Sequence, residues 1–206
     1  MNGRFLSFEG PDKAGKSTQI KLFCQYLEQK GIPHLLTREP GGCPVSEKIR
    51  ALILDPDNEM GDLCEALLYA AARSELVHSV IRPALEKGIW VICDRYVDSS
   101  IAYQGYGRGL GEQTVRSLNN LATESLLPDL SFYFRIDPDL AMQRATGAKD
   151  RMEQTDDVFR HKVAEGYEAL YQSHPERYCL IHADASVEQV HKQVIDGFEK
   201  WVSSCG

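Results

Sequence analysis

The hydrophobic positions of the chain switch repeatedly between the alternating pattern of a strand and the i, i+3, i+4 pattern of a helix. Short apolar runs predict strands at 4–9, 34–37, 89–93, 130–136 and 178–182. Helical spacing predicts helices at 17–30, 44–54, 62–87, 98–105, 112–126, 138–146, 156–173 and 186–203. This alternation is typical of an α/β protein with a parallel sheet and helices on both faces. A ligand of such a fold is expected beyond the carboxyl ends of the strands.

Composition narrows the possible partners and compartments. A chain of 206 residues is long enough for one domain, 1–206, with a substantial core. The formal net charge of −7 argues against a nucleic-acid-binding surface. No apolar run reaches the length of a membrane span, and a signal peptide would have to include the glycine loop described next. The six cysteines show no C-x-x-C spacing, which favours reduced thiols and a cytoplasmic protein.

A glycine-rich loop follows the first predicted strand. It reads Gly10-Pro11-Asp12-Lys13-Ala14-Gly15-Lys16-Ser17 and leads through Thr18 into a predicted helix. This is the complete G-x-x-x-x-G-K-[ST] pattern, in which backbone N–H groups surround a phosphate at a helix N-terminus. Lys16 is expected to reach the β/γ-phosphates, and the Ser17 hydroxyl to bind Mg²⁺. We therefore predict nucleotide binding at this loop.

The predicted strand at 89–93 ends in Asp94 and Arg95. A carboxylate at this place in phosphate-loop enzymes helps to hold Mg²⁺ together with the loop serine, so Asp94 is a candidate metal ligand. The alternative is that Asp94 caps the following helix. Arg95 needs an anion at the end of a core strand, and a phosphate offers it bidentate geometry.

Two residues of the predicted helix at 62–87, Tyr69 and Arg73, lie one turn apart on one face. No carboxylate stands at the i±3 or i±4 positions of Arg73, so this side chain either extends to water or meets a partner from elsewhere. With a phosphate site already predicted, contact with the substrate is the favoured interpretation. Tyr69 can stack on a flat base, although a lone aromatic on a helix is more often part of the core.

Further polar residues follow the second and third predicted strands. Arg38 precedes a Pro-Gly-Gly turn that ends the strand, and Arg50 lies on the next predicted helix with Glu47 at i−3 as a possible surface partner. In the segment 98–105, Gln104 is the best candidate to read the polar edge of a base. A helix cap at Asp98 or Ser99 is the competing explanation for that segment.

Four motifs together indicate a protein family. They are Phe8-Glu9-Gly10, Thr37-Arg38-Glu39-Pro40-Gly41-Gly42, Asp94-Arg95-Tyr96 and Ser100-Ile101-Ala102-Tyr103-Gln104-Gly105. In order and spacing they closely resemble the bacterial form of thymidylate kinase (dTMP kinase), and the resemblance spans nearly the whole chain. It implies transfer of the γ-phosphoryl group of ATP to dTMP, which gives ADP and dTDP. It also implies the P-loop nucleoside monophosphate kinase fold with a five-stranded parallel sheet, dependence on Mg²⁺, and a homodimer.

The same resemblance implies roles for single residues. Asp12 matches the loop carboxylate that faces the deoxyribose 3′-hydroxyl. Tyr69 takes the place of an aromatic residue that stacks on thymine. The positions that match family residues around the acceptor nucleotide or the transferring phosphate are Arg38, Arg50, Arg73, Arg95, Ser100, Tyr103 and Gln104.

The segment around 144–156 lies between two predicted helices, which suits a lid, with an ordinary loop as the alternative. The resemblance places Arg144 and Arg151 in this lid. The family is divided into a type with a basic residue in the phosphate loop and a type that supplies it from the lid. Lys13 is a feature of the first type, whereas Thr146 stands where the second type places an extra arginine. We therefore predict that Lys13, with Lys16 and Arg95, supplies charge to the transferring phosphoryl group, and that Arg151 is the alternative source.

Two other functions fit the phosphate loop alone. One is a kinase for another nucleoside monophosphate, against which the residues Tyr69, Arg73 and Gln104 favour dTMP. The other is a signalling GTPase, which would need an N-K-x-D-type segment after a later strand. The sequence contains no such segment.

Overall fold

The computed structural model describes residues 3–144, 151–152 and 154–204, and its centre is a five-stranded sheet. The strands are β1 (Phe5–Glu9), β2 (His34–Arg38), β3 (Trp90–Asp94), β4 (Leu130–Arg135) and β5 (Tyr178–His182). They lie in the order β2-β3-β1-β4-β5, and every neighbouring pair is parallel. The predicted parallel sheet is therefore confirmed, and each strand begins and ends within one residue of the expected range.

Strand β1 lies in the middle of the sheet, and all of its residues are buried. Phe8 is paired with Asp94 of β3 on one side and with Phe132 of β4 on the other. On the next strand along, Arg38 of β2 is paired with Asp94. This register brings the end of β1 and the glycine loop that follows it to the same edge of the sheet as Arg38 and Asp94.

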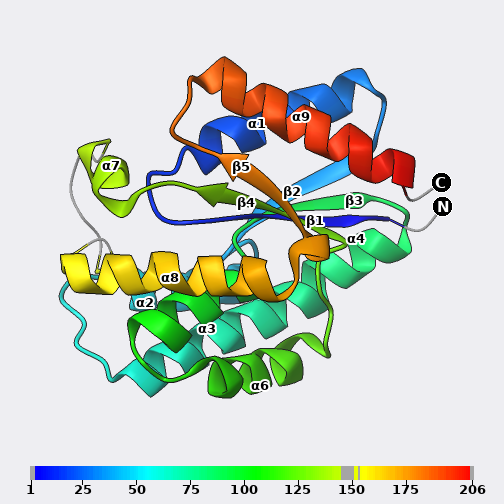
Figure 1. The fold of residues 1–206 in the computed structure, drawn as a ribbon. Helices are drawn as coiled ribbons and strands as arrows, with labels where there is room; N and C mark the ends of the chain where they lie inside the picture. The colour runs from blue at the N-terminus through cyan, green and yellow to red at the C-terminus, as the bar shows by residue number, and fades with distance from the viewer. Residues whose placement is uncertain (1–2, 145–150, 153, 205–206) are drawn as a thin grey trace.

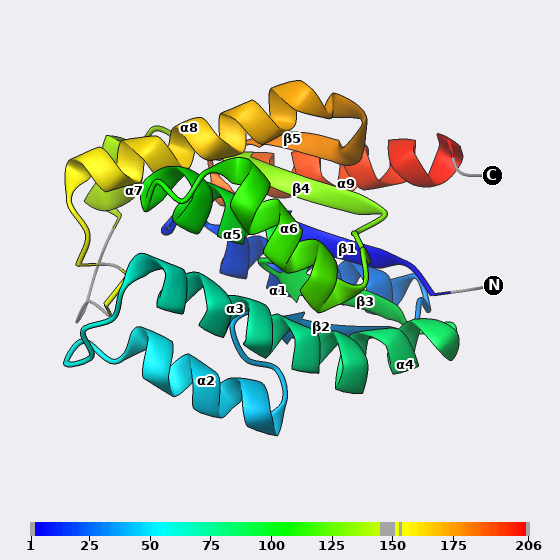
Figure 2. The ribbon, with the colours of Figure 1, turned by 90° about the horizontal axis from the view of Figure 1, so that it is seen from below.

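Helices cover both faces of the sheet (Figures 1 and 2). They are α1 (Lys16–Gln29), α2 (Pro44–Leu54), α3 (Asp62–Leu76), α4 (Arg82–Glu86), α5 (Val97–Ser100), α6 (Glu112–Thr123), α7 (Pro138–Gln143), α8 (Asp157–Ser173) and α9 (Val187–Ser204). Helices α1 and α9 pack on one face, and α2, α3, α4, α6 and α8 lie on the other (Figure 1). In α9, Val190, Val194 and Phe198 are buried, whereas Val187 and Val202, which continue the same apolar spacing, are exposed.

Four predicted helices differ from the observed ones. The helix expected at 138–146 ends at Gln143, and positions 145 and 146 lie outside the described residues. The helix expected at 62–87 is divided by a π-helical segment, Val77–Ile81, ahead of Pro83, which has no N–H to donate. The helix expected at 98–105 is the short α5 followed by a second π-helical segment, Ile101–Gly107. The helix expected at 112–126 ends at Thr123, because Glu124 and Ser125 adopt left-handed backbone angles.

Within the described part of the chain, no helix combines the length and the hydrophobicity that a membrane crossing requires. The predicted lid falls partly outside the described residues, which omit 145–150 and 153 and therefore Thr146. Arg144 follows α7, and Arg151 precedes α8, so the two described arginines stand on either side of this gap.

Candidate active site

The glycine loop connects β1 to α1 and folds around the ammonium group of Lys16. Lys16 donates from Nζ to the backbone oxygens of Gly10 at 2.9 Å and Pro11 at 2.7 Å. A Cβ atom on Gly10 would lie 2.6 Å from the Phe134 carbonyl oxygen, and Gly15 has a φ of 86°, so both positions require glycine. The loop is thus held by its own backbone and by one buried lysine.

The charge on Lys16 is poorly compensated in the absence of an anion. Burial, together with the positive charge of Arg95, lowers the pKa of Lys16 to about 8, although Asp94, Asp12 and Glu9 oppose this shift. A phosphate beside Nζ would stabilise the charged form. The electrostatics of the loop therefore favour an anionic ligand.

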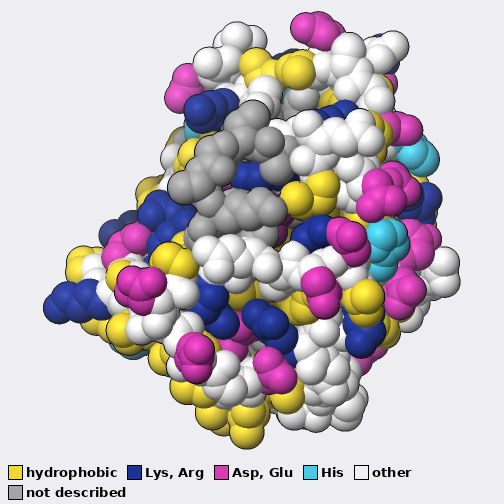
Figure 3. All heavy atoms as spheres, turned by 90° about the vertical axis from the view of Figure 1, so that its left-hand side faces the viewer, with side chains coloured by type: hydrophobic (Ala, Val, Ile, Leu, Met, Phe, Trp, Pro, Cys, Tyr) yellow, Lys and Arg dark blue, Asp and Glu magenta, His cyan; other side chains and the backbone are white. Residues whose placement is uncertain are grey.

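A cavity extends outward from this loop, and we call it the loop cavity. It is lined by Asp12, Lys13, Ala14, Gly15, Lys16, Ser17, Thr18, Asp94, Arg95, Arg144, Ala185, Ser186 and Val187. It opens at the carboxyl ends of the strands, the end of the molecule that is viewed in Figure 3, where Lys and Arg side chains are visible among Asp and Glu side chains. All the loop residues of the sequence prediction line it except Gly10 and Pro11, whose carbonyls hold Lys16.

Ser17 and Asp94 both line the loop cavity and are potential oxygen ligands for a metal ion. The Ser17 hydroxyl lies 3.5 Å from Oδ2 of Asp94, across the gap between α1 and β3. One hydroxyl and one carboxylate suit Mg²⁺, which in such sites takes its remaining ligands from phosphate oxygens and water. The residues present therefore fit the ion. Asp94 does not cap the next helix, because α5 has no side-chain cap and begins after Tyr96.

A second cavity lies against the first, and we call it the arginine cavity. It is lined by Asp12, Arg38, Glu39, Pro40, Arg50, Leu54, Tyr69, Arg73, Asp94, Arg95, Ser99, Ser100, Tyr103, Gln104 and Met152. All nine residues that the sequence suggested for the acceptor nucleotide are among them. The structure therefore brings these residues together from the loop, β2, α2, α3 and the segments that follow β3.

Arg95 stands between the two cavities. Its guanidinium donates to Asp12 Oδ1 at 2.6 Å, to the Gly10 carbonyl oxygen at 2.9 Å and to the Tyr167 hydroxyl at 3.1 Å. Tyr103 donates to the other oxygen of Asp12 at 2.8 Å. Burial alone would raise the pKa of Asp12, but Arg95, Lys16 and Tyr103 outweigh it and lower that pKa. Asp12 is thus an anion held by two neighbours.

Behind Arg95 lies a buried carboxyl group that the sequence analysis did not single out. Ser99 donates to Glu9 Oε2 at 2.7 Å and lies 3.2 Å from Nη1 of Arg95. Burial, followed by the charge of Asp98, raises the pKa of Glu9 to about 8. Asp98 accepts hydrogen bonds from Arg177 and Tyr178, so neither Asp98 nor Ser99 is the helix cap considered as an alternative.

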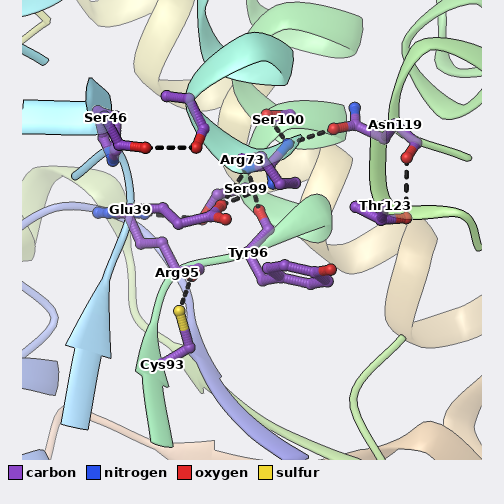
Figure 4. Close-up of polar contacts among 12 residues, drawn as sticks. Glu39, Ser46, Arg73, Cys93, Arg95, Tyr96, Ser99, Ser100, Asn119 and Thr123 are labelled. Carbon is purple, nitrogen blue, oxygen red and sulfur yellow. Dashed lines mark hydrogen bonds and ion pairs between the residues drawn. The ribbon is translucent and has the colours of Figure 1, made fainter. Parts of the chain in front are cut away.

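Arg73 is buried at the centre of a polar cluster (Figure 4). It donates from Nε to Glu39 Oε2 at 2.6 Å, from Nη1 to Ser100 at 2.9 Å and to Asn119, and from Nη2 to the Tyr96 carbonyl oxygen at 3.0 Å. Nη2 also lies 2.5 Å from Glu39. The partner that its own helix does not provide is therefore Glu39, which directly follows β2.

Glu47 pairs with Arg38 and not with Arg50, for which the sequence analysis had suggested it as a surface partner. Glu47 accepts from Arg38 at 2.9 Å and from the Gly42 backbone N–H at 2.7 Å. Arg50 instead donates to the Pro40 carbonyl oxygen at 2.7 Å and lines the arginine cavity. The suggestion that Glu47 pairs with Arg50 is therefore wrong.

Gln104 has a buried partner that the sequence analysis missed. It donates from Nε2 to Glu65 Oε1 at 3.0 Å, and Glu65 also accepts from Arg108 and Arg151. Glu65 stands four residues before Tyr69 and eight before Arg73, so all three share one face of α3. That spacing was the available signal for Glu65.

Comparison with known proteins identifies the family. The family model for thymidylate kinase matches residues 8–194. The chain belongs to the thymidylate kinase family. Its activity is the phosphorylation of dTMP, and thymidylate kinases use ATP. The family predicted from the four motifs is thus confirmed.

The similarity extends over nearly the full length of the relatives. The chain is 46% identical to the thymidylate kinase of Caldanaerobacter subterraneus subsp. tengcongensis over 203 residues, 98% of each chain. It is 48% identical to that of Lactobacillus helveticus over 206 residues, 97% of each chain. It is also 47% identical to that of Exiguobacterium sp. (strain AT1b) over 199 residues, which are 95% of this chain and 94% of the relative.

Proposed function

We propose that the loop cavity of this thymidylate kinase binds ATP with Mg²⁺ and that the arginine cavity binds dTMP. One observation carries this assignment: Asp12, Asp94 and Arg95 line both cavities. A phosphoryl group that passes from one nucleotide to the other must cross the boundary between their sites. The two cavities meet at the residues best suited to hold a metal ion and to neutralise an anion.

On the donor side, the backbone of 10–17 and the N-terminus of α1 would surround the phosphates. Ser17 and Asp94 would hold Mg²⁺, which neutralises charge on the β- and γ-phosphate oxygens when it is bound. Lys16 would leave its carbonyl partners for those oxygens, and Lys13 would meet the γ-phosphoryl group. Such a reaction needs little covalent chemistry from the protein, because positioning and charge stabilisation lower the barrier.

On the acceptor side, Arg95 would neutralise charge between the two phosphates, while Asp12 faces the deoxyribose 3′-hydroxyl. Tyr69 would stack on the base, and Gln104, with Ser100 and Tyr103 nearby, would meet its polar edge. Arg38, Arg50 and Arg73 supply positive charge around the bound monophosphate. Arg151, next to the lid at 144–156, is the alternative source of charge for transfer.

We further infer a single kinase domain, a homodimer and a cytoplasmic location. Leu52 of α2, Leu63 and Leu67 of α3 and Leu121 of α6 are exposed, by 48% to 82%. Large exposed apolar side chains support an association surface on these helices. The described cysteines Cys24, Cys43, Cys64, Cys93 and Cys179 are free thiols, which supports a reducing compartment. Light scattering of the purified protein tests the dimer.

The decisive experiment measures ADP release from ATP with a panel of acceptors: dTMP, dUMP, dCMP, dAMP and dGMP, with and without Mg²⁺. We expect the highest kcat/KM for dTMP and a requirement for the ion. A higher kcat/KM for another monophosphate would make that compound the acceptor. ADP release that is independent of every acceptor would contradict the assignment of the arginine cavity.

A further inference from the structure

Glu65 lies directly behind the arginine cavity and is the hub of four hydrogen bonds. Its Oε1 accepts from Gln104 Nε2 at 3.0 Å and from Arg108 Nε at 3.2 Å. Its Oε2 accepts from Arg108 Nη2 at 3.0 Å and from Arg151 Nη2 at 2.6 Å. The side chain is 1% exposed and is not itself among the lining residues of the cavity.

The charge state of Glu65 decides how Gln104 is oriented. Burial raises the pKa of Glu65, but hydrogen bonds from Arg108, Gln104 and Arg151 outweigh it and leave that pKa below its ordinary value. An ionised carboxylate accepts hydrogen bonds and donates none. The end of the Gln104 amide that faces Glu65 must therefore be its NH₂ group. In the opposite orientation, the Gln104 carbonyl oxygen and a carboxylate oxygen of Glu65, both acceptors, would face each other.

The other end of the same amide is left without a protein donor. Gln104 is 1% exposed and lines the arginine cavity, and within the described residues no group donates to its Oε1. A buried carbonyl oxygen without a donor is costly, so a ligand that supplies one is favoured over a ligand that supplies a second acceptor.

We propose that Glu65 is a specificity-determining positioning residue: it fixes the Gln104 amide with its carbonyl oxygen towards the ligand, so that the cavity selects a base whose ring nitrogen carries a proton. Thymine and uracil present such an N3–H group. Cytosine presents an N3 lone pair instead, which would face the oxygen of Gln104. The inference rests on the proposed function, since it requires a pyrimidine monophosphate in the arginine cavity.

Glu65 also connects base recognition to the segment that carries Arg151. The same carboxylate oxygen that meets Arg151 meets Arg108, whose guanidinium lies 4.7 Å from the centre of the Phe159 ring at the start of α8. Arg151 in addition donates from Nε to the Ile53 carbonyl oxygen at 2.7 Å. These contacts keep Glu65 ionised and in place, so the orientation of Gln104 is set before a base arrives.

The test is a competition assay with ATP and equimolar dTMP and dCMP in one reaction. The ratio of dTDP to dCDP equals the ratio of the two kcat/KM values and does not depend on how much of a variant is folded. In Glu65→Gln the carboxylate is replaced by an amide that can donate to Gln104, so Gln104 is free to turn its NH₂ group towards the base. We expect the preference for dTMP over dCMP to fall by about tenfold to a hundredfold, the range for a hydrogen bond to a charged group.

Three controls separate this role from a merely structural one. The dTMP/dUMP ratio of Glu65→Gln should stay within about twofold of the parent, because both bases present the same edge. Glu168→Gln removes a carboxylate that pairs with Arg135 through two hydrogen bonds outside both cavities, and should change neither ratio. In a Gln104→Leu background, which should itself lose the preference, Glu65→Gln should have no further effect on the dTMP/dCMP ratio.

An unchanged dTMP/dCMP ratio in Glu65→Gln would overturn the inference. The inference would also be overturned if Glu65→Gln lowered the dTMP/dCMP ratio just as much in the Gln104→Leu background. If Glu65→Gln does not fold, Glu65→Asp, which withdraws the carboxylate by one methylene, should show the fall in its place. A parent that uses dTMP and dCMP equally would also overturn the inference while leaving pyrimidine kinase activity intact. A parent that phosphorylates neither would instead refute the proposed function.

Discussion

The loop cavity and the arginine cavity lie side by side but are built in different ways. The loop cavity is made mainly of consecutive residues, 12–18, whose shape comes from backbone angles at Gly10, Lys13 and Gly15. The arginine cavity is made of side chains from many elements, and its buried members Arg73 and Gln104 are held by partners far away in the sequence. Glu39 and Arg73 are 34 positions apart, and Gln104 and its partner Glu65 are 39 positions apart.

This difference has an energetic consequence. Lys16 of the loop donates to two neutral carbonyl oxygens, so its removal leaves no partner charge unpaired. Removal of one member of a buried ion pair strands the other member's charge, which costs far more than the pair contributes. We therefore expect substitutions on the acceptor side to lower both stability and activity, and substitutions on the donor side to lower activity alone.

The largest effect is expected for Arg73→Ala. It leaves Glu39 buried beside no positive charge, and burial already raises the pKa of Glu39. The expected loss in the free energy of unfolding is about 3–5 kcal/mol. In the folded fraction, the KM for dTMP should rise much more than the KM for ATP, because Arg73 also holds Ser100 at the wall of the arginine cavity. Urea unfolding and initial rates with each substrate varied measure the two effects.

Arg135→Ala is the matched control for Arg73→Ala. The pair Arg135–Glu168 has similar geometry, at 2.6 Å, but both side chains are 34% exposed. Its removal should cost about 1 kcal/mol or less and change neither KM. A stability loss in Arg73→Ala with both KM values unaltered would make Arg73 purely structural.

Lys16→Ala should produce the next largest effect, on activity alone. The β/γ-phosphates lose their fixed positive charge, and kcat should fall by about 10²- to 10³-fold. Stability should change little beyond the loss of two hydrogen bonds to neutral carbonyl oxygens, because no partner charge is left unpaired and burial already disfavours the charge of Lys16. The control Lys21→Ala removes an exposed lysine from the same helix. Near-parental turnover of a folded Lys16→Ala protein would exclude the loop as the phosphate site.

The same contrast between the two cavities explains which parts of the site could be predicted from the sequence. The phosphate loop is contiguous, so its residue types and spacing are visible directly, and the strands follow from short apolar runs, of which β1 and β4 are buried along nearly their whole length. The pairs Arg73–Glu39 and Gln104–Glu65 depend on which chain segments meet in space. Residue type and position alone suggested Arg95, Tyr69, Arg73 and Gln104, and the family resemblance added Asp12, Ser100 and Tyr103. The buried partners Glu39 and Glu65 were not found.

The misplaced helix ends have local causes that residue type does not reveal. Pro83 marks a break that the apolar spacing of 62–87 runs across, and the hydrogen-bond ladder adjusts through the π-helical segment Val77–Ile81. Helix α6 ends where Glu124 and Ser125 adopt left-handed angles, although neither is a glycine. The pattern of hydrophobic positions fixes which face is buried, but it does not fix such backbone changes.

Lys13→Gly is the smallest of the expected effects and the most direct test of the donor side. Lys13 has a φ of 62°, which glycine adopts without steric cost, so the substitution should not lower the free energy of unfolding. If Lys13 meets the γ-phosphoryl group mainly in the transition state, kcat should fall by roughly tenfold to a hundredfold while the KM for ATP changes little. Lys13→Arg should restore much of the lost kcat, because it returns the charge to the same position. A kcat of Lys13→Gly within about twofold of the parent would instead leave Arg151 as the source of that charge, and Arg151→Ala should then show the tenfold or greater loss.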